Sequence, residues 1–251
     1  FKVLSLMRYK VNISYDGTNY LGFQAQPHKN TIQDTIEKAL MQILHLDQRI
    51  IMASRTDAGV HALDQVFHFD INEKLDCFRL KGSFNAVLPK DIHVNNVEEV
   101  DESFHARFSV KSKTYIYLIN YEEFSPFLIN RAYQCKYHLD VEKMRECSRL
   151  FLGEHDFSSF STSTYEEKPD QRRTIYDFEI INENGNLLIV KITGDGFLRN
   201  MVRIIVGSLI EVGRGKKNIS DIEEMLNNPC KSTRRYNIVP YGLYLARINY
   251  N

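Results

Sequence analysis

The sequence lacks long apolar runs, paired cysteines and net charge, and each absence narrows the possible functions. No stretch of the 251 residues approaches the roughly 20 consecutive apolar residues that a membrane-spanning helix needs, so we expect no membrane partner. Residues 1–6 do not resemble a secretory signal, because they contain no small-residue cleavage site. We expect them to be an extension that precedes a natural start at Met7.

Disulfide frameworks and metal sites are not indicated either. The four cysteines are scattered without a Cys-x-x-Cys spacing, which fits a protein of the reducing cytoplasm. Among the eight histidines, His61 and His68 lie too far apart in sequence to face one another on a helix, and no acidic residue completes a ligand set. We therefore expect a cytoplasmic protein without a metal centre.

The charge balance argues mildly against a nucleic-acid partner, because the 32 basic and 32 acidic residues cancel. Each local group of basic residues is, taken alone, more consistent with a solvated face. RNA binding therefore requires several of these groups to line one side of the molecule, with the acidic run at 98–102 facing away. The groups are Arg107-Lys111-Lys113, Arg172-Arg173, Arg199-Arg203, Arg214-Lys216-Lys217 and Lys231-Arg234-Arg235.

The first half of the chain predicts helices alternating with strands. Apolar residues alternate with polar ones over residues 9–15, which is typical of a half-buried strand. A helix is expected from a cap at Thr31 to about residue 46, and a second over 76–87, before Pro89. Apolar runs lie at 49–53 and 65–71, and another strand starts at residue 92 and ends in the acidic run.

The second half repeats this pattern. Its strongest helix is expected from Phe197 to about residue 212, ended by Gly213. Asp140 caps another helix, and a short one covers 220–227. Strands are expected at 115–121, 174–181, 187–194 and 244–248, with a turn at 184–186.

The halves meet near residue 110, without a Pro- or Gly-rich linker. We therefore predict an α+β protein with an N-terminal subdomain over residues 7–109 and a C-terminal one over 110–251. Each is expected to be a sheet with helices on one face, because an amphipathic helix must bury its apolar side.

The segment 53–62 (ASRTDAGVHA) is the most informative part of the chain. It places Arg55 and Asp57 two residues apart, on a loop that leaves an apolar run and turns at Gly59. A carboxylate held beside a guanidinium stays ionised and can act as a nucleophile on a rigid turn. On residue types alone, a surface ion pair or a turn cap explains an Arg-x-Asp pair better.

The whole ten-residue string resembles the active-site motif of the tRNA pseudouridine synthase A family. Five further segments are similar to motifs of that family and occur in the same order, although the family usually has Trp at Phe23 and small, apolar residues over 232–241. Short matches are individually weak, but six in order are specific. The other segments are 15–26, 104–108 with 113–117, 153–160, 197–203 and 242–245.

The resemblance implies the pseudouridine synthase fold, in which two similar ferredoxin- or RRM-like halves join their sheets around a central catalytic cleft. It implies that Asp57 is the nucleophile, that Arg55 helps to flip the target base and that Arg203 pairs with Asp57. Tyr115 matches a tyrosine that stacks on the uracil, and Leu245 matches an apolar residue that lines the pocket. Without the resemblance, both would be assigned to the core.

The implied reaction is the isomerisation of uridine to pseudouridine in the anticodon arm of tRNA, at positions 38–40, by a homodimer. It has no redox step, so no cofactor is implied. RNA contacts are assigned to the segment Phe104, His105, Ala106, Arg107 and Phe108 and to the pair Arg172 and Arg173.

Two other functions remain possible from the residues alone. A non-catalytic RNA-binding module would use strand aromatics such as Tyr115, Tyr117 and Tyr121. A hydrolase would use Asp57 as its nucleophile, but it would also need a base that activates water, and no residue is placed for that role.

Overall fold

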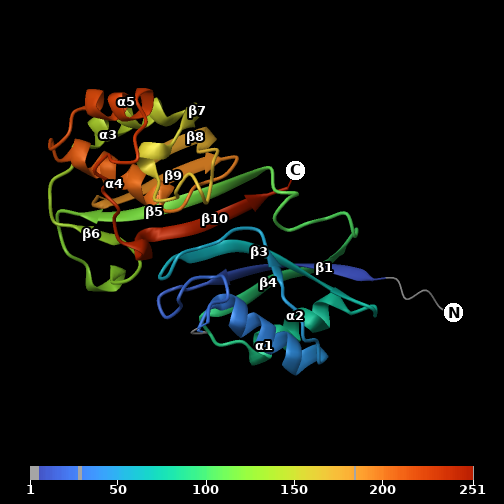
Figure 1. The fold of residues 1–251 in the computed structure, drawn as a ribbon. Helices are drawn as coiled ribbons and strands as arrows, with labels where there is room; N and C mark the ends of the chain where they lie inside the picture. Colours follow the sequence, from blue (N-terminus) through green and yellow to red (C-terminus); the bar gives the residue numbers. More distant parts are fainter. Residues whose placement is uncertain (1–5, 28–29, 184, 251) are drawn as a thin grey trace. The chain divides into compact units, whose positions relative to one another are not determined.

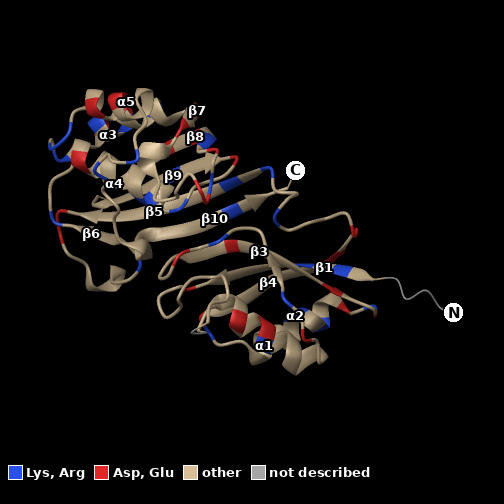
Figure 2. Ribbon diagram, in the orientation of Figure 1, with Lys and Arg blue, Asp and Glu red and all other residues tan. Residues whose placement is uncertain are grey.

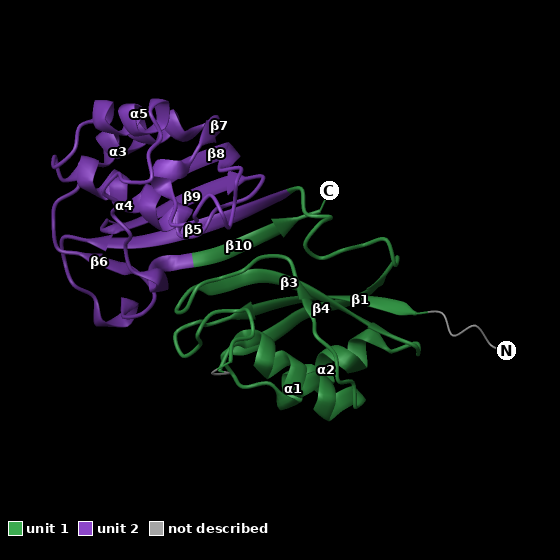
Figure 3. Ribbon diagram, viewed as in Figure 1, with its two compact units in different colours: residues 1–111, 244–251 green, residues 112–243 purple. Residues whose placement is uncertain are grey.

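The computed structural model describes residues 6–27, 30–183 and 185–250. The chain divides into two compact units, residues 1–111 with 244–251 and residues 112–243 (Figure 3). Most of the expected extension, residues 1–5, lies outside the described residues, and so does Asn184 of the expected turn at 184–186.

The sheet of the first unit has the strand order β4-β1-β3-β10, with β2 also paired to β3. β1 is antiparallel to β3 and β4, whereas β10 is parallel to β3. Two strands share one edge of β3. Tyr244 and Leu245 of β10 pair with the start of β3, and β2 pairs with β3 farther along the strand. The elements are β1 (Met7–Tyr15), α1 (Ile32–Leu44), β2 (Ile51–Met52), β3 (His61–Ile71), α2 (Cys77–Val87), β4 (Ile92–Val100) and β10 (Leu243–Asn249).

Helices α1 and α2 cover one face of this sheet (Figure 1). The alternation expected over residues 9–15 is confirmed, since Tyr9, Val11 and Ile13 are fully buried on β1. The predicted cap at Thr31 is also confirmed, and Asp76, at the expected start of the second helix, is its cap. The Thr31 side chain accepts a hydrogen bond from the Asp34 N–H, and Asp76 accepts from two backbone N–H groups at the start of α2. Each cap satisfies donors that a helix leaves without an internal partner.

The second unit has a sheet in the order β6-β5-β9-β8-β7. β5, β9, β8 and β7 are antiparallel in turn, and β6 is parallel to β5. Helices α3, α4 and α5 cover one face (Figure 1). The elements are β5 (Ser112–Tyr121), β6 (Tyr133–Cys135), α3 (Val141–Ser148), β7 (Gly153–Asp156), β8 (Arg172–Glu183), β9 (Leu187–Gly194), α4 (Met201–Gly213) and α5 (Ile219–Asn227).

Helix α4 begins four residues later than its apolar pattern predicts. Asn200 has a φ of +62°, which is left-handed and cannot continue a right-handed helix, so the chain turns between Phe197 and Asn200. The predicted end at Gly213 is confirmed, and the helix is buried along most of its length.

The last strand differs from the sequence-based division of the chain. Residues 244–251 were expected within the C-terminal subdomain, but they cluster with the first unit. The pairing of β10 with β3 and three further hydrogen bonds attach these residues to the first unit. The Ile248 N–H donates to Asp64, the Lys111 N–H donates to the Asn249 carbonyl, and the Tyr250 hydroxyl donates to the Ala106 carbonyl.

The segment 232–241 crosses α4 at Gly207. A Cβ atom at Gly207 would lie 1.8 Å from the Tyr236 carbonyl oxygen, so only glycine allows this approach. Tyr117 fixes the same segment farther along, where its hydroxyl donates to the Val239 carbonyl at 2.7 Å. The segment is therefore held through backbone atoms, which tolerate many side chains.

We predict that Gly207→Ala destabilises the protein by roughly 1–3 kcal/mol, the usual cost of overpacking. The matched control is Gly82→Ala on α2, where a Cβ would meet nothing within 4 Å. That change should stabilise by about 0.5–1 kcal/mol, because alanine favours the helix over the unfolded chain. Urea titrations of both variants test this, and equal effects would contradict the close approach at Gly207.

Candidate active site

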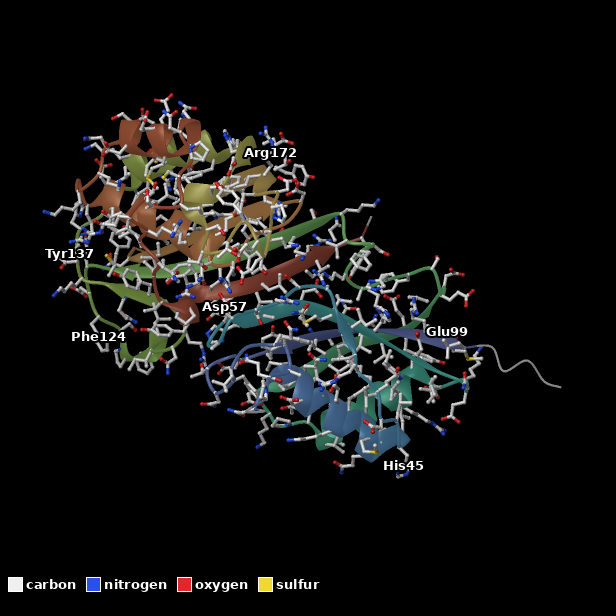
Figure 4. The ribbon with its side chains drawn as sticks, in the orientation of Figure 1. His45, Asp57, Glu99, Phe124, Tyr137 and Arg172 are labelled. Atoms are coloured by element: carbon white, nitrogen blue, oxygen red, sulfur yellow. The ribbon has the colours of Figure 1, made fainter. Side chains whose placement is uncertain are left out.

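Asp57 lies on the loop between β2 and β3 (Figure 4), and two glycines from the segment after β1 pack against this loop. A Cβ at Gly17 would lie 1.9 Å from the Val60 carbonyl oxygen. A Cβ at Gly22 would lie 2.7 Å from the Thr56 carbonyl oxygen and 3.2 Å from the carbonyl carbon of Asp57. The segment therefore supports the backbone of the loop on both sides of Asp57.

Hydrogen bonds fix the same loop. The Phe23 N–H donates to the Thr56 carbonyl at 3.1 Å, and the buried hydroxyls of Tyr15 and Thr56 lie 2.7 Å apart. Gln65 is fully buried on β3, and its amide both donates to the Ser54 carbonyl and accepts from the Ser54 N–H. Because buried polar groups are costly to leave unpaired, these bonds hold the loop in one conformation.

His61 closes the far end of the loop. Its Nδ1 accepts a hydrogen bond from the Gly17 N–H at 3.0 Å, and its buried ring packs on Tyr244 with the centroids 4.6 Å apart. An Asp16 carboxylate oxygen also lies 3.0 Å from Nδ1, but it accepts from the Thr18 N–H and hydroxyl. His61 thus joins the end of the Asp57 loop to the segment 16–18 and to β10.

The local ion pair expected from residue types alone is not formed. Asp57 is half-buried, whereas Arg55 is exposed and makes no salt bridge with any residue that the structure describes. The loop therefore presents a carboxylate on a fixed backbone and leaves the neighbouring guanidinium available. A carboxylate of this kind can serve as a nucleophile.

The other predicted pocket residues are well ordered by their own surroundings. Tyr115 on β5 is buried and meets the Phe197 ring edge-on at 5.1 Å. Arg203 on α4 is half-buried, and its Nε donates to the Ile238 carbonyl at 2.7 Å while Nη1 donates to Asn200 Oδ1 at 2.9 Å. Leu245 is fully buried opposite Ala62 on β3. The pairing of Arg203 with Asp57 stays a prediction.

The predicted RNA-contact segment 104–108 is held by the half-buried Arg8 and the buried His68 of the first unit. Arg8 donates to the carbonyls of Glu102 and Phe104 and binds Asp70 with two hydrogen bonds, which lower the pKa of that carboxyl. His68 Nδ1 accepts from the Ala106 N–H at 3.0 Å. Because Ala106 is fully buried, its contribution is structural.

Arg107 and Phe108 occupy the exposed tip of this segment. Phe108 is 77% exposed and packs on the His105 ring at 4.3 Å, and the Arg107 guanidinium lies over the Phe108 ring at 5.7 Å. His105 Nδ1 accepts from the backbone N–H groups of both tip residues. Such a tip can contact a phosphate and a base face.

The remaining predicted RNA contacts are Arg172 and Arg173 at the start of β8. Arg172 is exposed and forms a salt bridge with Glu154 at 2.8 Å, and Arg173 donates to the Asp170 carbonyl at 3.3 Å. Surface salt bridges contribute little to stability, so Glu154 does not prevent Arg172 from binding a phosphate. Their role in RNA binding stays a prediction.

Sequence reasoning did not single out several supporting residues. Gln65, His68 and Arg8 form hydrogen bonds with residues 11 to 96 positions away, and no local pattern marks such partners. Gly17 and Gly22 belong to the matched segment 15–26, and the glycine residues themselves were the sequence signal that could have indicated a close backbone approach.

In the part of the chain that the structure describes, no group of three His, Cys, Asp or Glu residues could hold a metal ion. No helix there is long and apolar enough to cross a membrane.

Comparison with known proteins identifies the family. Its model, described as tRNA pseudouridine synthase, matches residues 12–109 and 147–251. The chain belongs to the tRNA pseudouridine synthase family. A protein named tRNA pseudouridine synthase A from an Exiguobacterium species is 44% identical over 98% of both chains. One of the same name from Anoxybacillus flavithermus is 43% identical over 98% of this chain and 100% of its own.

A solved structure of a Cbf5-Nop10-Gar1 complex is only distantly similar. It shares 14% identity at a TM-score of 0.37, over 80% of this chain and 45% of that one. The family assignment depends on the close relatives, whose lengths this chain covers almost entirely.

The buried His68 predicts a pH dependence of stability. Burial, with smaller contributions from Arg8 and His105, lowers the pKa of His68 to about 4, although Asp70 opposes this shift. In the unfolded chain His68 takes up a proton as the pH falls below its ordinary pKa of 6.5. In the folded protein it takes up that proton only near pH 4, so between these pH values protonation favours the unfolded chain. We predict that stability falls by up to about 3 kcal/mol between these pH values for this reason.

The variant His68→Asn isolates this contribution, because the Asn carbonyl can accept from the Ala106 N–H but does not titrate. Urea titrations from pH 7 to pH 4 should give a shallower loss of stability for the variant than for the original protein. If the two proteins lose stability in parallel as the pH falls, His68 takes up its proton at the same pH in the folded and the unfolded state, and the prediction is wrong.

Proposed function

We propose that the chain isomerises uridine to pseudouridine in tRNA, with Asp57 as the nucleophile. The observation that carries this conclusion is the full-length identity of about 44% to a tRNA pseudouridine synthase A, together with a half-buried Asp57 on a backbone-clamped loop. The chain is accordingly an isomerase that modifies tRNA.

The reaction breaks the bond between uracil N1 and the sugar and forms one from C5 to the same sugar carbon. The proton on C5 is lost and N1 gains one, so atoms and electrons balance without a redox partner. The protein must therefore provide a nucleophile, a proton acceptor and a pocket that retains the detached base. Asp57 attacks, and the clamp on its loop reduces the motion that would misplace its oxygen.

The target base must leave the helical stack before it can react, which costs a few kcal/mol. Arg55 is suited to occupy the vacated space, because its guanidinium is exposed and has no salt-bridge partner among the described residues. We assign the stacking on uracil to Tyr115 and the apolar wall to Leu245. We assign to Arg203 the pairing with Asp57, which would keep that carboxylate ionised and oriented.

The finer points of the proposal follow from the family resemblance. The substrate uridines are those at positions 38–40 of the anticodon arm, the enzyme acts as a homodimer in the cytoplasm, and no cofactor takes part. The exposed Arg107 and Phe108 contact the RNA backbone, as do Arg172 and Arg173, since phosphate contacts position a nucleic acid without reading its sequence.

We predict that Asp57→Asn abolishes pseudouridine formation but leaves tRNA affinity within about threefold, because an amide is a poor nucleophile and many phosphate contacts remain. Asp47→Asn, the same change at an exposed residue of the same unit, should keep full activity. The assay is base mapping in tRNA carrying labelled uridine. Turnover by Asp57→Asn would refute the assignment, while unchanged RNA or released uracil with the original protein would indicate a binding module or a hydrolase.

We also predict that Gly22→Ala reduces kcat by at least about tenfold, because a misplacement near 1 Å is enough for a large loss of rate. Gly22 has a φ of +91° and touches the loop of Asp57. The control is Gly153→Ala, where φ is +88° but nothing lies within 4 Å. Both variants carry the same backbone strain, but Gly22→Ala also clashes with the Thr56 carbonyl and should lose more stability, so kcat is compared at a temperature at which both variants are folded. Equal kcat values would show that the clamp does not position Asp57.

A further inference from the structure

Lys231 is held in a fixed position in the second unit. Its Nζ donates to Gln171 Oε1 at 2.9 Å and lies 5.3 Å from the centre of the Tyr165 ring. Gln171 is only 1% exposed, and its Nε2 donates to the carbonyls of Thr164 and Lys168. These two bonds orient the Gln171 amide, so its oxygen faces Lys231 and cannot easily turn away.

Arg235 lies beside Lys231 and adds a second positive charge. Its Nη2 donates to the Lys231 carbonyl, and its Nε is buried without a hydrogen-bond partner among the described residues. Both side chains are half-buried, and neither forms a salt bridge within the part of the chain that the structure describes. Burial and the nearby Arg235 lower the pKa of Lys231.

Two half-buried cations side by side are costly, because each loses hydration and repels the other. The Asp156 carboxylate attracts Lys231 and opposes the fall in its pKa. It forms no salt bridge with either cation among the described residues, and its Oδ1 accepts from the Ser158 N–H and hydroxyl. One carboxylate therefore offsets the two charges only in part, and an anion from outside can neutralise the rest.

The pair also adjoins a second basic group. Gln171 directly precedes Arg172 and Arg173, so the hydrogen bond from Lys231 brings together two groups about 60 residues apart in sequence. Arg172 is labelled in Figure 4, and Figure 2 shows that basic and acidic residues are otherwise interspersed over the unit. The exposed ring of Tyr165 lies beside Lys231 and offers a face for stacking. This extended arrangement suits a polyanion better than a single small anion.

We propose that Lys231 and Arg235, positioned by Gln171, bind a phosphate of the RNA backbone. The site rests on the proposed function, which supplies the RNA, but the reaction does not require it. The site extends the proposed RNA surface beyond Arg172 and Arg173.

The test compares the salt dependence of tRNA binding. In the double variant Lys231→Met with Arg235→Met, the slope of log K against log salt should fall by about 1, since each phosphate contact contributes about 0.9. The control is Lys136→Met with Lys143→Met, which removes two exposed charges from the same unit, outside this cluster. Identical slopes for the original protein and the Lys231–Arg235 variant would overturn the proposal.

A second variant guards against misfolding. Arg235→Gln keeps a polar side chain and leaves Lys231 and the buried Gln171 unchanged, so it removes one charge and should reduce the slope by up to about 1. In both variants KM for tRNA should rise while kcat stays the same, because no reacting group is changed. An unchanged slope with Arg235→Gln would contradict the site even if the double variant unfolds.

Inorganic phosphate separates RNA binding from the capture of a free anion. At constant ionic strength, millimolar phosphate should weaken tRNA binding by the original protein more than binding by the double variant. If phosphate stabilises only the original protein against heat but the RNA slopes agree, the site binds free anions and the proposal is wrong. If the slopes differ but no pseudouridine forms, the RNA contact stands and the proposed reaction fails.

Discussion

The close approach of the segment 17–23 to the loop of Asp57 is the contact on which the candidate site depends. Gly17 and Gly22 bring backbone against backbone at distances that exclude any Cβ atom. The Tyr15 and Thr56 hydroxyls and the Gln65 amide then satisfy the polar groups buried there. A carboxylate on an unsupported loop would sample many positions, and only a small fraction of them would suit an attack on a sugar carbon.

A close backbone contact at a glycine also occurs in the second unit. Gly207 lets the segment 232–241 cross α4 at the Tyr236 carbonyl, and Arg203 and Tyr117 bind two further carbonyls of that segment. Because these contacts involve backbone atoms, the side chains of the segment can change without loss of packing. This explains how the segment accommodates polar and basic residues such as Arg234 and Asn237 while it crosses a buried helix.

The elements that the sequence predicted well are those with local causes. The caps Thr31, Asp76 and Asp140 bond to backbone groups two or three residues away, so residue type and position suffice to place the helix starts. The start of α4 was misplaced because its apolar pattern continues through a turn that the left-handed Asn200 creates. The short strands β6 and β7 were not expected, since three or four residues carry too little periodicity.

The sequence alone determined the family and the reaction class and predicts Asp57 as the nucleophile, because these follow from a string of residue types in a fixed order. The tertiary structure decided which residues support that string. Gln65, His68 and Arg8 bond to loops that are distant in sequence, and the final strand joins the first unit through its pairing with β3. It also brought Lys231 to Gln171, across 60 residues. Such contacts join residues that are distant in sequence, so they depend on the tertiary fold, and no local sequence pattern predicts them.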